Sequence, residues 1–326
     1  VHDHISVQKI GHRTTFSPIS DRLPSDRPNR QLYEIRAMPR DSFSQGHLTR
    51  FVALLLLLPG VLTAGDKSKI RKPARLLLLW HSPDGHPRTT HEYQAGMRII
   101  AGQLQRHHGV QALLIHANDP WRKGPELLDG ADAAALFISE GAKWVSSAPK
   151  RLAAFQRLAA RGGGLVGLHW GIGTRPAEPI PAFLALLGGC HGGPDRKYTV
   201  VTAKATPAQS RHPVLNGISP FEVKDEFYYR LKFTSAGGGV TPLLKVPIDG
   251  SEETVSWAWQ RPDGGRSFGF SGLHFHGNWN RPEYRRLVTQ GLLWTLKQPI
   301  PASGVKVPLS AAELKLPPAP KQPPGK

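Results

Sequence analysis

The chain has 326 residues, a formal net charge of +18 and one cysteine, Cys190. This length can hold one large α/β domain or two small ones around a sizeable core. A single thiol excludes an internal disulfide, so the fold must rely on that core. The positive charge raises the question of a polyanionic partner, but we expect no nucleic acid, because the chain lacks a recognisable binding motif.

The N-terminal 65 residues do not have the pattern of a folded domain. From Met38 a basic segment leads into "FVALLLLLPGVLTAG", which is typical of a signal peptide over residues 38–65. We therefore expect an exported protein, periplasmic or extracellular, and expect residues 1–37 to be a spurious upstream extension or disordered. A single membrane anchor with a cytoplasmic tail is the alternative, and the shortness of the apolar run disfavours it.

A dense basic cluster, "KSKIRKPAR", follows at residues 67–75. We favour a solvated leader for this cluster; the alternative is a weak contact with an anionic surface such as lipid or cell-wall polymer.

Four apolar runs of strand length then alternate with helical patterns. The runs are "RLLLLWHS" (75–82), "QALLIHAN" (111–118), "AAALFIS" (133–139) and "GLVGLH" (164–169), and helices are expected at 92–107 and within 146–164. Continuous apolar runs favour strands that are buried on both faces. The pattern predicts a parallel α/β sheet flanked by helices.

The second half of the chain is β-rich. Strands are expected at 197–205, 221–233, 240–246, 253–260 and 266–276, before a closing helix at 281–298. These strands predict an antiparallel extension of the parallel sheet. The folded domain should span residues 70–298, and the Pro-rich segment 299–326 is expected to be a surface strap that ends in a disordered tail.

The stretch "GGGLVGLHWGIG" (162–173) places His169 at the tip of a predicted buried strand. Ligands of open α/β sheets bind beyond the carboxyl ends of the strands. The local pattern G-x-H-x-G is that of a nucleophile elbow with His in the nucleophile's position. His169 is therefore a candidate acid, base or metal ligand; the alternative is a buried histidine bonded to the backbone.

The stretch "SGLHFHGNW" (271–279) carries His274 and His276 on one predicted strand, where residues two apart point to one face. Two such imidazoles can share a metal ion, zinc by ligand type. His169 would complete a metal site with them; Asp84, His86 and His91 are the other candidates for a third ligand.

Three further groups of residues are candidates for the same pocket. His91 and Glu92 lie in the loop after the first strand, and Asp225 and Glu226 are adjacent on a strand, so that only one of them can face a site. Asp225 and Glu226 are candidate catalytic residues. The candidate substrate-binding residues are His91, Glu92, Trp170, Tyr228 and Trp279, whose aromatic members would suit the apolar face of a sugar ring.

The set "GGGLVGLH", "HPVLNGI", "DEFYY", "GRSFGFSGLHFHGNW" and "EYRRLVTQGLLW" resembles the ThuA-like (trehalose-utilisation) proteins of the class I glutamine amidotransferase-like superfamily. The resemblance implies a flavodoxin-like, mostly parallel sheet and a role in disaccharide use. Amidotransferases of this fold carry a cysteine nucleophile at the elbow, where this chain has His169, so glutaminase chemistry is excluded there.

Three functional hypotheses follow. The first is an exported protein that acts on a carbohydrate or sugar derivative by acid/base or metal-assisted chemistry. The second is a non-catalytic glycan-binding module on the same fold. The third is a polyanion binder driven by charge.

Overall fold

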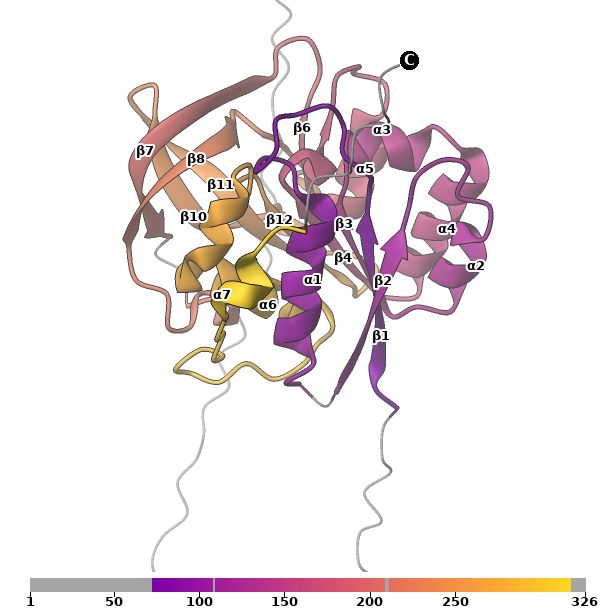
Figure 1. Cartoon of the computed structure of the whole chain (residues 1–326). Helices are drawn as coiled ribbons and strands as arrows, with labels where there is room; N and C mark the ends of the chain where they lie inside the picture. Colours follow the sequence, from indigo (N-terminus) through magenta and orange to yellow (C-terminus); the bar gives the residue numbers. More distant parts are fainter. Residues whose placement is uncertain (1–71, 108, 209–210, 318–326) are drawn as a thin grey trace, which may run out of the picture. The chain divides into compact units, whose positions relative to one another are not determined.

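The computed structural model describes residues 72–107, 109–208 and 211–317, and within these ranges the main sheet has nine strands (Figure 1). In chain order they are β1 (Ala74–Trp80), β2 (Val110–His116), β3 (Ala133–Phe137), β4 (Gly164–Leu168), β7 (Lys197–Pro207), β8 (Phe221–Tyr229), β10 (Thr241–Ile248), β11 (Ser251–Gln260) and β12 (Arg266–Phe270). Across the sheet their order is β2-β1-β3-β4-β12-β11-β10-β7-β8. Short strands β5 (Gly173–Thr174), β6 (Gly189–Gly192) and β9 (Lys232–Phe233) form a second sheet.

The five strands from β2 to β12 run parallel to one another. Four consecutive leucines of β1, Leu76 to Leu79, are fully buried. Because successive side chains of a strand point to opposite faces, Leu76 and Leu78 enter one hydrophobic core and Leu77 and Leu79 the other. A strand covered on both faces needs no polar side chain, which explains the continuous apolar run.

Strand β12 joins the two halves of the sheet, since it pairs parallel to β4 and antiparallel to β11. The strands beyond it, β11, β10, β7 and β8, pair antiparallel throughout. The predicted architecture, a flavodoxin-like parallel sheet continued by an antiparallel extension, is confirmed.

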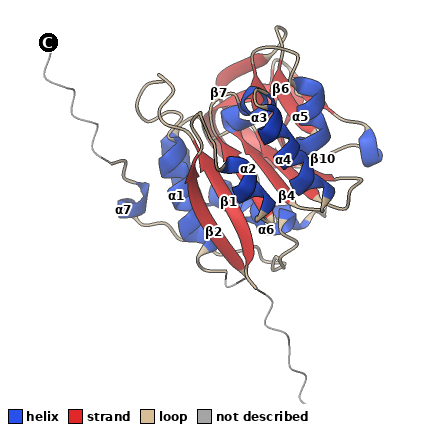
Figure 2. Cartoon of the chain, turned by 90° about the vertical axis from the view of Figure 1, so that its right-hand side faces the viewer, coloured by secondary structure: helices blue, strands red, loops and turns tan. Residues whose placement is uncertain are grey.

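Helices cover both faces of the parallel half (Figure 2). Helices α1 (Tyr93–Leu104) and α6 (Pro282–Thr295) pack into the core that holds Leu76. The opposite core receives α2 (Gly124–Asp129), α3 (Gly141–Ser146), α4 (Pro149–Ala160) and α5 (Ile180–Leu187). The helices expected at 92–107 and 281–298 are α1 and α6, and each is shorter at its ends.

One expected strand is too long. The segment 266–276 leaves the sheet after Phe270, because Leu273 has a φ of 83°, which is incompatible with an extended strand. Residues 271–275 form a loop, and the single-turn helix η4 (His276–Asn280) follows. The other such turns are η1 (His169–Ile172), η2 (Pro213–Leu215) and η3 (Ala236–Gly238).

The segment after α6 runs as a strap over α1 and α6 as far as Pro317. Val305 and Val307 are buried in the core beneath it. Gln103 of α1 donates to the carbonyl of Pro308 at 2.8 Å, and short helix α7 (Ala311–Leu314) begins with a capping box between Ser310 and Glu313. The strap is therefore a packed part of the domain.

Within the described ranges no helix is both long and apolar enough to cross a bilayer. The predictions for residues 1–37 and 38–65, most of the basic cluster at 67–75, and the end of the tail from 318 onward lie outside the described residues.

Candidate functional site

His169 stands where β4 ends and the chain turns into η1. Its φ is 47°, in the left-handed region that residues other than glycine rarely adopt. Two residues later, a Cβ on Gly171 would overlap the carbonyl group of Leu136, so only glycine fits there. The sharp turn predicted at this strand end is confirmed, and it holds a fully buried imidazole.

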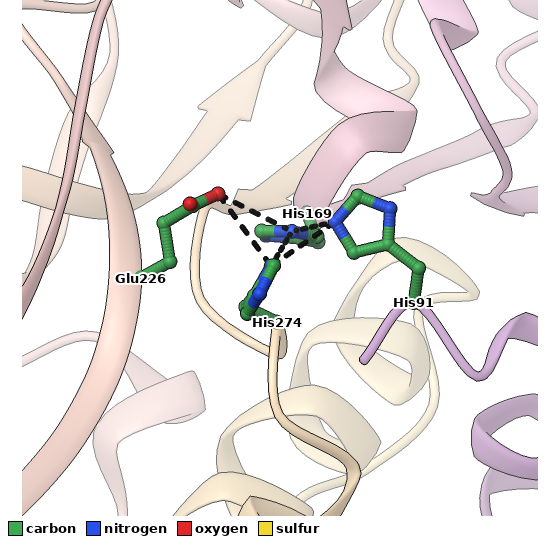
Figure 3. A group of neighbouring side chains, drawn as sticks. All are labelled: His91, His169, Glu226 and His274. Carbon is green, nitrogen blue, oxygen red and sulfur yellow. Dashed lines mark hydrogen bonds and ion pairs between the residues drawn. The ribbon is translucent and has the colours of Figure 1, made fainter. Parts of the chain in front are cut away.

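Four side chains from distant parts of the sequence converge at this turn (Figure 3). His169 Nε2 lies 2.9 Å from His91 Nε2 and 3.3 Å from His274 Nδ1. His91 Nε2 and His274 Nδ1 are 3.1 Å apart. Glu226 Oε1 is 3.5 Å from His274 Nδ1 and 3.9 Å from His169 Nε2. We call these four residues the His₃Glu cluster.

Hydrogen bonds at the outer edges of two imidazoles fix where their protons lie. His169 Nδ1 is 2.8 Å from the carbonyl oxygen of Ser271, which can only accept, so Nδ1 carries a hydrogen. His91 Nδ1 is 3.0 Å from the carboxylate of Asp84 and donates likewise. In the neutral rings both Nε2 atoms then carry lone pairs, and these face each other at 2.9 Å. Such a contact requires a proton or a metal cation.

Burial disfavours an additional proton on the imidazoles of the cluster. It lowers the pKa of His169 well below the ordinary value, with a further contribution from His91. Burial also lowers the pKa of His91, although Asp84 acts in the opposite direction, and lowers that of His274 to about 4. The three imidazoles are therefore neutral near pH 7, which is the form that binds metals.

The spacing of the donor atoms fits a metal ion. Nitrogens bound to one tetrahedral zinc ion lie about 3.3 Å apart, because each bond is about 2.0–2.1 Å long. The nitrogen separations of 2.9 to 3.3 Å are close to this value. Three imidazoles and a carboxylate form a ligand set suited to zinc and similar divalent ions, so the cluster could hold one metal ion.

Asp84 supports His91 from outside the cluster. Its carboxylate accepts from His91 Nδ1, from the Tyr93 hydroxyl at 2.7 Å and from His86 Nδ1 at 2.7 Å. Burial alone would raise the pKa of Asp84, but the hydrogen bonds from His91 and Tyr93 outweigh it and hold the pKa well below its usual range. A carboxylate behind a histidine is the arrangement that orients metal-binding imidazoles in proteins.

Asp225 and Glu226 face opposite sides of β8, as their adjacency predicts. Glu226 reaches the cluster, and burial, with a smaller contribution from Asp225, raises its pKa to about 7. Asp225 is fully buried on the other side, where it accepts from the backbone N–H of Leu273 at 2.7 Å and from Tyr284 at 3.0 Å. Asp225 thus holds the loop that carries His274.

A cavity of about 120 Å³ opens beside Glu226. Its lining includes Trp170, Tyr228, His191, Arg175, Arg196 and Tyr198. The Tyr228 hydroxyl lies 3.1 Å from His169 Nε2, which places this residue between the cavity and the cluster. A ligand in the cavity would therefore meet the cluster through Glu226 and Tyr228.

Comparison with known protein families shows the family to which the chain belongs. The family model described as "ThuA: Trehalose utilisation" matches residues 78–295. The chain belongs to the ThuA family. This membership suggests a role related to trehalose utilisation. A comparison with curated proteins gave no match.

The chain is similar to several solved structures. A protein described as ThuA-like from Bacteroides uniformis ATCC 8492 is 16% identical, with a TM-score of 0.52 over 69% of this chain and 92% of that one. A cytoplasmic protein from Salmonella typhimurium LT2 is also 16% identical, with a TM-score of 0.46 over 68% and 97%. A glutamine amidotransferase from Thermotoga maritima is 9% identical, with a TM-score of 0.40 over 70% and 100%. The first of these supports the fold.

Two residues expected at the site of this ThuA-family chain lie elsewhere. His276 does not share a face with His274, because the chain has left the sheet; its Nε2 lies 2.8 Å from the carbonyl oxygen of Leu314. Trp279 is not in the cavity but buried in the core against Phe137. The expectation of a metal ligand at His276 and of a sugar contact at Trp279 is wrong for this geometric reason.

Other expected residues take different places from those predicted. Asp225 is a support of the loop and not a group that meets substrate, since all its contacts are to the protein interior. His91, expected to bind substrate or to be the third metal ligand, is in the cluster and also lines the cavity. Glu92 accepts from the backbone N–H of Thr89 at 3.0 Å and lines a second cavity of about 460 Å³ that also includes Asp84 and His86.

Sequence reasoning missed Arg175, His191, Arg196 and Tyr198 of the cavity. His191 directly follows Cys190 in the stretch "GGCHGG" (188–193). That cysteine, Cys190, is fully buried, and burial raises the pKa of its thiol to about 12. Its thiol is therefore a core group and not a nucleophile.

Proposed function

We propose that this ThuA-family protein is a metal-dependent protein that acts on a carbohydrate or sugar derivative. One observation carries the proposal: lone pairs of buried, neutral imidazoles converge at 2.9 to 3.3 Å beside a carboxylate. His91, His169 and His274 would hold the ion, and zinc is the metal that best suits these ligands. When bound, such an ion supplies Lewis acidity that polarises a substrate oxygen.

The remaining groups suit proton transfer. Glu226 Oε1 lies at the edge of the cluster and borders the cavity, where a carboxylate can accept a proton and return it. The pKa of Tyr228 is raised well above its usual value by burial and by Glu226, so its hydroxyl stays protonated. With His169 Nε2 holding an ion, the Tyr228 O–H would be free to donate to a substrate oxygen.

We also propose that the protein is exported, on the strength of the signal-peptide pattern at residues 38–65. Expression of the full chain and separation of cell fractions tests this. We expect a product shortened by cleavage near residue 65 outside the cytoplasm, and an uncleaved cytoplasmic product would contradict it.

The metal is tested by elemental analysis of protein purified without chelator, together with thermal unfolding with and without added zinc. We expect about one ion per chain and a higher unfolding temperature with zinc. His274→Ala should lose both effects. His276→Ala is the matched control, since this histidine is in the same segment and outside the cluster, and it should retain the ion.

Absence of stoichiometric metal together with no response to zinc would overturn the proposal, and so would equal losses in the two variants. Turnover is tested with metal-loaded protein and Glu226→Gln. We expect the variant to keep the ion and lose turnover of the sugar substrate. If instead sugars bind but no variant or metal affects any turnover, a glycan-binding module replaces the enzyme.

A further inference from the structure

The aromatic rings of the cavity have little free surface for a sugar. Tyr228 is enclosed on both faces: the ring of His169 stacks on it at 4.6 Å and that of His191 at 4.1 Å between centroids, with interplanar angles of 18° and 10°. Trp170 is only 6% exposed, and the guanidinium of Arg175 lies 5.5 Å from its ring centroid. Only Tyr198, at 57% exposed, offers an open face.

Recognition inside the cavity must therefore come from polar and charged groups. Glu226 is the only acidic residue among the described residues that line it, whereas Arg175 and Arg196 both line it. The lining thus carries two positive side chains and one negative, and Glu140 offsets part of the charge of Arg175.

The two arginines are held in place by the protein. Arg175 is anchored by Glu140, whose carboxylate accepts from the Arg175 backbone N–H at 3.0 Å and from its guanidinium. Glu140 does not line the cavity. Arg196 donates to the carbonyl of Gly193 at 3.2 Å, and within the described residues it makes no ion pair with a carboxylate. Arg196 accordingly keeps donors for a ligand.

The positive charge of Arg196 acts on His191, which lines the cavity. The pKa of His191 is lowered to about 3, first by burial and then by Arg196 and Lys232. Lys232 is bound by Asp195 at 2.9 Å, so its charge is partly offset. No ion pair of Arg196 with a carboxylate offsets its charge within the described part of the chain.

We propose that the cavity selects a sugar derivative that carries an anionic group, a carboxylate or a phosphate, which Arg196 and Arg175 bind. This inference rests on the proposed function, since the sugar oxygens would then face Glu226 and the metal site. Guanidinium groups bind carboxylate and phosphate through paired hydrogen bonds, and a neutral sugar lacks that interaction.

Calorimetric titration of the metal-loaded protein with glucuronate, glucose 6-phosphate and glucose tests the inference. We expect one or both anionic sugars to bind at least about tenfold more tightly than glucose, and to weaken as salt is raised, because the contact is electrostatic. The stronger of the two identifies the anionic group. Equal binding of all three sugars would overturn the inference.

The arginine variants separate this contact from direct binding of an anion to the metal. Arg196→Gln should reduce the preference for the anionic sugar by about tenfold, the scale expected of one charge-assisted pair. Arg122→Gln, an exposed arginine outside the cavity, should not. A preference that Arg196→Gln and the double variant with Arg175→Gln both leave intact would refute the assignment.

Elemental analysis of the same samples keeps the two proposals apart. A protein without metal that still prefers the anionic sugar, and loses that preference in Arg196→Gln, supports the anion site and overturns the metal site. A protein with one ion per chain and no preference supports the metal site and overturns the anion site.

Discussion

Replacement of Asp84 by Asn tests whether the carboxylate behind His91 prepares the cluster for a metal. The Asp84 carboxylate accepts hydrogen bonds from three residues, His91, His86 and Tyr93, and an amide oxygen can replace only part of them. The amide NH₂ can also face His91 Nδ1 as a donor. That would place a hydrogen on Nε2, where a metal needs the lone pair.

The expected magnitude follows from this arrangement. Loss of a group that orients a metal-binding histidine weakens metal affinity about 10- to 100-fold, which corresponds to about 1.4–2.7 kcal/mol. At the same free zinc concentration, the stabilisation by zinc falls by that amount. For a domain of this size each kcal/mol shifts the unfolding temperature by about 2–4 °C, so the rise caused by zinc should shrink by roughly 3–11 °C.

The assay is competition for zinc with a chelator of known affinity, with thermal unfolding as a second measurement. Asp129→Asn is the control, since this carboxylate is exposed and pairs with Arg157 on α4 away from the site. Wild-type zinc affinity in Asp84→Asn would refute the argument that this carboxylate fixes the His91 tautomer. Equal weakening in both variants would show a general effect of charge instead.

Two other predictions concern stability. Gly141→Ala should lower the free energy of unfolding by about 1–3 kcal/mol or more, because the new Cβ would overlap the carbonyl of Gly171 behind the elbow. Gly277→Ala is the control, since its Cβ meets open space and the variant should unfold like the wild type. Denaturant unfolding compares the two variants, and equal midpoints would contradict the predicted overlap. Burial and then Arg266 lower the pKa of His212 to about 4. As pH falls, His212 of the unfolded chain is therefore protonated before His212 of the folded protein. The contribution of neutral His212 to stability is present above pH 6.5 and is lost as pH falls toward 4. At pH 5 the loss is at most about 2 kcal/mol, and about 1 kcal/mol after allowance for partial exposure. Between pH 7 and 5, His212→Gln should therefore lose that much less unfolding free energy than the wild type. Parallel curves of unfolding free energy against pH for the two proteins would contradict this.

The arrangement of the sheet could be predicted from the sequence because burial on both faces leaves a direct mark. A strand such as β1, with leucines 76 to 79 between two cores, has no position for a polar residue. The change to alternating, β-rich segments after His191 likewise marks the antiparallel extension. These signals are local, and local signals can be read from a single sequence.

The site was predicted only in part, because its decisive features are not periodic. His169 could be found from its strand and the glycines around it. The pairing of His274 with His276 failed, because a left-handed φ at Leu273 turns the chain out of the sheet. Arg196 could not be found at all, since arginines are frequent in this basic chain and only the folded loop shows which one meets the cavity.

The strap between Pro299 and Pro317 has a practical consequence for anyone who trims the chain. Its composition is that of a dispensable tail, and a boundary chosen by composition would fall just before it. Such a cut would uncover the hydrophobic surface beneath Val305 and Val307 and would free His276 from the Leu314 carbonyl. Helix α1, which follows His91, would also lose the contact of Gln103 with Pro308, so a shortened protein that binds metal poorly would report on the missing strap and not on the histidines.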